Sequence, residues 1–118
     1  METFSFIDLV DPNETGVFLV KARISLLSKE ESSRNNGIKN KFRPNHNFGS
    51  SSNREFYIGQ IELLEGEVIN LGETADVNVR FIKGRGLKEL LTIGRQWKIQ
   101  EGSRLIGEAT VLEVTNET

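Results

Sequence analysis

The chain has no cysteine, and it contains one histidine, one tryptophan and two prolines among its 118 residues. The absence of cysteine excludes disulfide bonds and thiolate metal sites. No apolar run approaches the length of a membrane span, and the N-terminus lacks a basic region before an apolar one. We therefore expect a soluble cytoplasmic protein of one domain, because a chain of this length can bury a core without disulfide bonds.

Motifs for catalysis, cofactors and metals are also scarce. No Gly-x-x-x-x-Gly-Lys-Ser/Thr motif is present, which excludes nucleotide hydrolysis by that mechanism. His46 follows Asn45 in a polar segment without a carboxylate nearby in sequence, so we expect an exposed loop histidine. Glu62 is expected on the polar face of a strand, and Glu65 and Glu67 in a solvated turn. The sequence therefore predicts a protein that is not an enzyme and has no cofactor or metal.

Charge is nearly balanced overall, with a net charge of −2, but it is unevenly distributed. Segments 32–54 and 83–98 are rich in lysine and arginine, and the first of them has no acidic residue. Segments 1–16 and 56–79 carry only acidic charges. Such segregation could form a positive patch that attracts phosphates or an acidic protein, although charges on solvated loops could also intermingle in three dimensions.

Hydrophobic periodicity predicts strands. Ala75, Val77, Val79 and Phe81 alternate with polar residues, and four other segments show the same period of two. Short strands of this kind, separated by turn residues, favour an all-β sandwich or barrel. Trp97 occupies an apolar strand position, which favours core packing over a stacking platform. The expected interior residues are Val20, Ile24, Ile61, Val77, Val79, Trp97, Ile99 and Val111.

The connections agree with this prediction. Glu101–Ser103 is typical of a tight hairpin, and Leu71–Glu73 of another turn. Residues 32–54 are predicted to be a long loop, broken by a short extended piece around Phe42–Phe48. Leucines within Leu87–Leu91 indicate a single helical turn.

Several blocks share their order and spacing with one known family. They are Leu27–Glu31 (LSKEE), Arg34, Phe42–Asn45 (FRPN), Gly59–Leu63 (GQIEL) and Gly94–Gly107, which contains the Glu-Gly hairpin. Together they resemble the C-terminal β-barrel, domain III, of elongation factor Tu. The likeness covers about 17–114, with a short insertion within 49–54. It implies a single antiparallel six-stranded β-barrel at 17–118, which exists here without a GTPase domain.

Residues 1–16 lie outside the resemblance. The apolar stretch Phe4–Val10 is expected to pack on the barrel surface that other domains of the full factor would bury, or to mediate a homodimer. The resemblance also implies tRNA-contact positions, which in this chain are Asn45, Ile58, Glu101 and Gly102. Asn45 and Glu101 could hydrogen-bond to ribose, and Gly102 would allow close backbone approach.

Two departures weaken this likeness to the tRNA-binding surface. Ile58 lacks the hydroxyl of the family residue, and Gln100 replaces a basic one. Asparagine and glycine also favour turns wherever they occur, so these positions could be structural only. Lys39, Lys41 and Arg43 would supply phosphate contacts if the protein binds RNA.

These observations predict a non-enzymatic, translation-related binding module whose partner is tRNA or a translation-factor protein. The alternative is a regulatory or immunity-type protein that mimics the elongation factor's barrel and binds one of that factor's protein partners.

Overall fold

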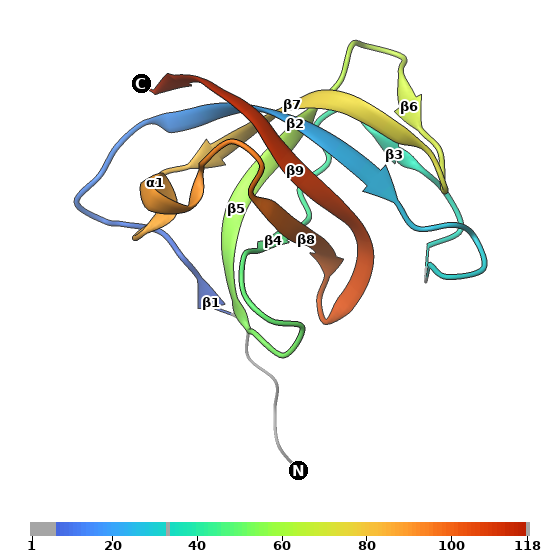
Figure 1. Cartoon of the computed structure of the whole chain (residues 1–118), viewed down its shortest axis with the longest axis horizontal. Coiled ribbons are helices and arrows are strands. Elements are labelled where there is room, and N and C mark those ends of the chain that lie inside the picture. Colours follow the sequence, from blue (N-terminus) through green and yellow to red (C-terminus); the bar gives the residue numbers. More distant parts are fainter. Residues whose placement is uncertain (1–6, 33, 118) are drawn as a thin grey trace.

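The computed structural model describes residues 7–32 and 34–117, and it is a closed β-barrel with additional short elements (Figure 1). Six antiparallel strands close the barrel in the order β5-β4-β8-β9-β2-β7, and β7 pairs back onto β5. The barrel strands are β2 (Val17–Leu26), β4 (Asn45–Asn47), β5 (Glu55–Glu62), β7 (Thr74–Ile82), β8 (Gln96–Glu101) and β9 (Arg104–Glu117). The prediction of an antiparallel six-stranded barrel is confirmed.

Alternation of side chains explains the core. Along β2 the even-numbered residues from Phe18 to Leu26 are buried, and the odd-numbered ones are exposed or half-buried. The closing pairs join Val79 of β7 to Val20 of β2 on one side and to Ile61 of β5 on the other. All eight residues that the sequence placed in the interior are buried, Trp97 among them. The interior prediction is therefore confirmed.

Short elements lie on opposite sides of the barrel (Figure 1). A small antiparallel sheet of β3 (Ile38–Lys39) and β6 (Val68–Ile69) lies beside the barrel (Figure 1). The predicted helical turn is α1 (Leu87–Leu90), in which Leu87 is buried. The predicted turn at Leu71–Glu73 is also present, and Gly72 supplies the positive φ of 83° that it requires.

The extension before the barrel contributes one strand, which lies outside the closed barrel. β1 (Ile7–Asp8) runs parallel to the start of β5, where the amide of Ile7 donates to the carbonyl of Arg54 at 2.8 Å. The amide of Leu9 donates to the carbonyl of Phe56 at 2.7 Å, and the Leu9 side chain packs against the core. Ile7 is 55% exposed, so β1 covers the edge of β5 only in part. Phe4 and Phe6 of the predicted apolar stretch lie outside the described residues.

Deletion of residues 1–12 should therefore destabilise the barrel. The truncated chain loses the two backbone hydrogen bonds to β5 and the buried part of Leu9, which together stabilise by about 1–3 kcal/mol. We expect a lower thermal midpoint in a circular dichroism melt. An unchanged midpoint and an unchanged oligomeric state would mean that the extension contributes nothing to the fold.

Candidate functional site

Arg34 joins two neighbouring hollows at one end of the barrel. Its guanidinium donates to the carbonyls of Asn36 and Gly37 at 3.0 and 3.1 Å, and to a carboxylate oxygen of Glu101 at 2.8 Å. It also lies over the ring of Phe42, 4.8 Å from the ring centroid. With its donors committed in this way, Arg34 fixes the loop after β2 against the β8–β9 hairpin.

The larger hollow, which we call the basic hollow, has a volume of about 600 Å³. It is lined by Arg34, Lys39, Lys41 and Phe42, together with Asn40 and Val68. Within the part of the chain that the structure describes, Lys39 and Lys41 make no hydrogen bond or ion pair through their side chains. Their ammonium groups are therefore available to an anion.

A tight turn sets the position of Lys41. The amide of Phe42 donates to the carbonyl of Lys39, and Lys41 has a φ of 70°, the one positive value among described residues other than glycine. The left-handed conformation costs a lysine about 1 kcal/mol, and such strain is found preferentially at binding sites. The amide of Lys41, which donates to the carbonyl of Ile61 at 2.9 Å, holds this turn against β5.

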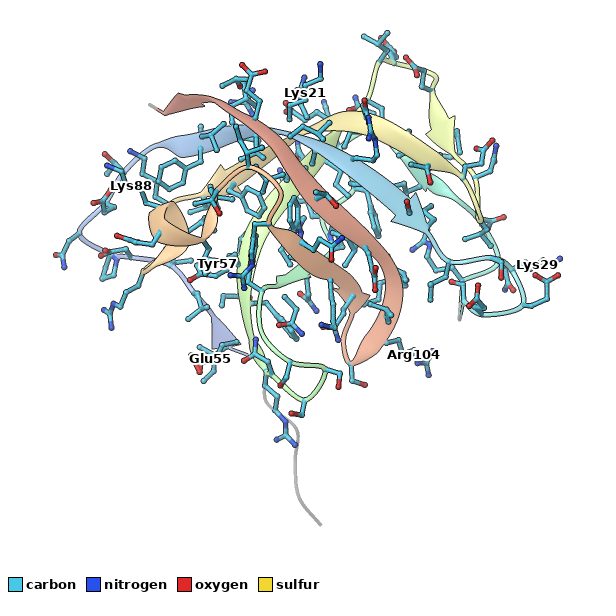
Figure 2. All side chains as sticks on the ribbon, in the orientation of Figure 1. Lys21, Lys29, Glu55, Tyr57, Lys88 and Arg104 are labelled. Carbon is cyan, nitrogen blue, oxygen red and sulfur yellow. The ribbon has the colours of Figure 1, made fainter. Side chains whose placement is uncertain are left out.

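The second hollow, the hairpin hollow, has a volume of about 420 Å³ and is lined by Arg34, Asn35, Asn36, Glu101 and Arg104. Gly102 has a φ of 58° at the first central position of the predicted two-residue hairpin, as a type II′ turn requires. Arg104 follows this turn and extends away from the barrel (Figure 2). The two hollows together are lined by four cationic side chains and one carboxylate, so their combined surface is positive.

The residues predicted to bind RNA lie in different places in the structure. Lys39 and Lys41 line the basic hollow, while Glu101 lies in the hairpin hollow and Gly102 forms the adjoining turn. Asn45 is half-buried in β4, where it pairs with Ile58 and Gln100. Asn45 therefore lies beside Ile58, another of the positions predicted to contact tRNA.

Arg43 lies apart from the other predicted RNA-binding residues. Its Nε donates to the side-chain oxygen of Gln60 at 2.8 Å, and it lines a separate hollow on the outer face of the barrel. The sequence missed Arg34 and Arg104, which are brought to this end by folding. Arg34 and Glu101 are 67 positions apart in the chain, and no local pattern signals their pairing.

The prediction that His46 is an exposed loop histidine is wrong. The residue lies in the middle of β4, is fully buried, and pairs with Tyr57 of β5 and Ile99 of β8. Its Nδ1 accepts a hydrogen bond from the indole Nε1 of Trp97 at 3.0 Å. Its Nε2 must therefore carry the proton, which it donates to the carbonyl of Gly59 at 2.9 Å.

Burial keeps the His46 ring neutral. Desolvation lowers the pKa of His46 to about 4, although the bond to the Gly59 carbonyl opposes this shift. Gly59 lies so close that an added Cβ would stand 2.9 Å from both His46 and the Phe81 ring. A neutral ring enclosed in this way by packed side chains is a structural element of the core.

Polar side chains on the outer face of β4 form a second cluster that the sequence did not predict. The amide of Asn47 donates to the side-chain oxygen of Gln100, and Asn47 in turn accepts from Asn53 at 2.7 Å. Asn47 and Gln100 are buried beneath the loop at 49–54. The loop at 49–54 therefore shields this polar cluster from solvent.

The remaining chemistry is limited. The described residues contain no group of three or more histidine or acidic side chains that could hold a metal ion. Within 7–32 and 34–117, no helix is long and apolar enough to cross a membrane. The chain matches no known family model.

Proposed function

We propose that this barrel is a non-enzymatic binding module of translation, which resembles domain III of elongation factor Tu and binds RNA through the basic hollow. The observation that carries the proposal is the pair of unpaired lysines, Lys39 and Lys41, beside the Arg34 guanidinium. Phosphate groups are attracted to such a surface whatever the base sequence. The neighbouring hairpin hollow adds Arg104 at the rim and a Glu101 carboxylate that can accept from a ribose hydroxyl.

The geometry also supports a division of roles. Lys39 and Lys41 would hold phosphates, because nothing else in the described structure neutralises them. Arg34 would position the loop and the hairpin rather than contact RNA as its main task, because Glu101 and two carbonyls already occupy its donors. Asn45 would contribute little, because β4 holds it half-buried between two strands. Arg43 would lie outside the interface.

A salt titration tests this proposal. We expect tRNA to bind the wild-type protein with a steep dependence on salt, and the Lys39→Ala/Lys41→Ala variant to bind more weakly. Each lost phosphate contact should flatten the log–log slope by about 0.7–0.9, so the double variant should lose about 1.5. Fluorescence anisotropy with labelled tRNA at several salt concentrations measures both quantities.

The matched control removes two lysines elsewhere. Lys21 lies on β2 and Lys88 on α1, away from the hairpin that carries Arg104 (Figure 2). The Lys21→Ala/Lys88→Ala variant has the same net charge as the test variant, and its salt slope should match that of the wild type. Equally weak binding by all three proteins would argue against RNA. It would favour the alternative, a barrel that mimics the elongation factor to bind one of its protein partners.

A further inference from the structure

A separate hollow lies on the outer face of the barrel where β2, β5 and β7 meet. This aliphatic hollow has a volume of about 190 Å³, enough for one branched side chain, and shares no lining residue with the basic or hairpin hollow. Val17, Ile58 and Ile82 form its apolar lining, and Ile82 is 41% exposed although it lies in a barrel strand. Such an apolar depression on a strand face is suited to a partner's aliphatic side chain.

Positive groups flank this lining. Arg43 and Arg80 both line the hollow, and Gln60 lies between them. Arg43 donates to Gln60, which donates to Glu62 at 3.2 Å, and Glu62 accepts from Arg80 at 3.1 Å. This row contains two guanidinium groups, from Arg43 and Arg80, and one carboxylate, from Glu62. The rim of the hollow therefore carries excess positive charge. The side chain that enters the hollow should therefore have acidic neighbours.

The same chain presents such a side chain. The turn Leu64–Glu67, which we call the acidic turn, follows β5 and projects beyond the barrel just before β6 (Figure 1). Leu64 is 75% exposed, and Glu65 and Glu67 are exposed on either side of Gly66. Neither glutamate has a hydrogen bond or an ion pair through its side chain in the described structure. An exposed leucine followed by two free carboxylates is the chemical complement of the aliphatic hollow.

We propose that the aliphatic hollow receives Leu64 from the acidic turn of a second copy of this chain. The hollow and the turn are close in sequence, because Ile58 lies near the middle of β5 and Leu64 just after its end. Two β5 strands lying antiparallel across a two-fold axis near Gln60 and Glu62 bring each Leu64 to the other copy's hollow. Glu65 and Glu67, which follow Leu64, then lie next to the hollow that Arg43 and Arg80 flank. The contact is self-complementary, so assembly stops at a dimer.

Analytical ultracentrifugation across a concentration series tests the association. We expect a reversible monomer–dimer equilibrium, which Leu64→Asp should weaken by about tenfold or more because it places a charge in the apolar hollow. Ile93→Asp is the matched control, because Ile93 is similarly exposed, at 79%, but lies in the loop after α1. A protein that is monomeric up to millimolar concentration, or a dimer insensitive to Leu64→Asp, would overturn the proposal.

Crosslinking tests the orientation. Because the chain has no cysteine, the Leu64→Cys and Ile82→Cys variants can be mixed and oxidised with copper phenanthroline without competing thiols. The proposed dimer predicts a disulfide-linked heterodimer from this mixture and none above background from Leu64→Cys mixed with Ile93→Cys. Equal yields from the two mixtures would show random collision and refute the contact.

Discussion

Val79→Asp is expected to abolish the cooperative folding of this barrel. Val79 is fully buried in β7, where it faces Val20 and Ile61 across the two strand pairs that close the sheet. A carboxylate at this position has no cationic partner, and its burial costs several kcal/mol or more. That cost is comparable with the entire stability of a small domain, which is about 5–15 kcal/mol. We expect collapsed amide dispersion in a heteronuclear NMR spectrum and no sigmoidal transition in urea.

Asn78→Asp is the matched control for this substitution. Asn78 is the neighbour of Val79 on the same strand, and it is exposed because the strand alternates. The added charge is the same, but water solvates it, so the free energy of unfolding should change by no more than about 0.5 kcal/mol. A Val79→Asp protein that unfolds cooperatively near the wild-type midpoint would contradict the observed closure of the barrel at this pair.

The core was predictable because side-chain alternation is a local property of a strand. Val20 and Ile24 lie on the buried face of β2 whatever strand is adjacent, so a period of two in the sequence is sufficient to locate them. The turn at Gly102 was predictable for a related reason, since only the local backbone conformation decides which residue is favoured there.

The burial of His46 depends on tertiary structure. His46 lies in β4, a strand of three residues. The His46 ring is enclosed only because β5 and β8 pair with β4 on either side. The sequence did contain a signal, because Phe42, Pro44, His46 and Phe48 alternate with polar residues. The polar composition of segment 32–54 made the histidine resemble a loop residue and concealed that alternation.

The same dependence on tertiary structure limits what could be predicted of the basic hollow. The acid-free segment indicated a positive surface, and Lys39 and Lys41 do line one. Arg43 lies just before β4, and its side chain points to the outer face of the barrel. It therefore lines the hollow on that face rather than the basic hollow. Arg34 reaches Glu101 only because the loop after β2 lies against the hairpin of β8 and β9.

Stability should fall as the pH drops from about 6.5 to about 4, because His46 is held neutral in the folded protein. The pKa of His46 is lowered to about 4 by burial, whereas an unfolded histidine takes up its proton near pH 6.5. Between these values the unfolded chain binds a proton that the folded protein does not, so acid favours unfolding. The difference between the two pKa values corresponds to about 3 kcal/mol in the free energy of unfolding. This stabilisation is fully present above pH 6.5 and is lost as the pH falls to about 4.

Urea titrations at successive pH values measure this loss, and Trp97 is a suitable fluorescent probe because it is the chain's one tryptophan and donates to His46. His46→Gln separates the histidine from the other acid-sensitive groups, because an amide can donate and accept without titrating in this range. The variant should be less stable than the wild type at pH 7, but the difference should shrink as the pH falls. The salt bridge with Arg23 holds the pKa of Asp76 below its usual range, so its stabilisation is lost mostly at more acidic pH, and its effect is the same in the wild type and in His46→Gln. Parallel stability curves for the two proteins between pH 6.5 and 4 would show that His46 is not held neutral by the barrel.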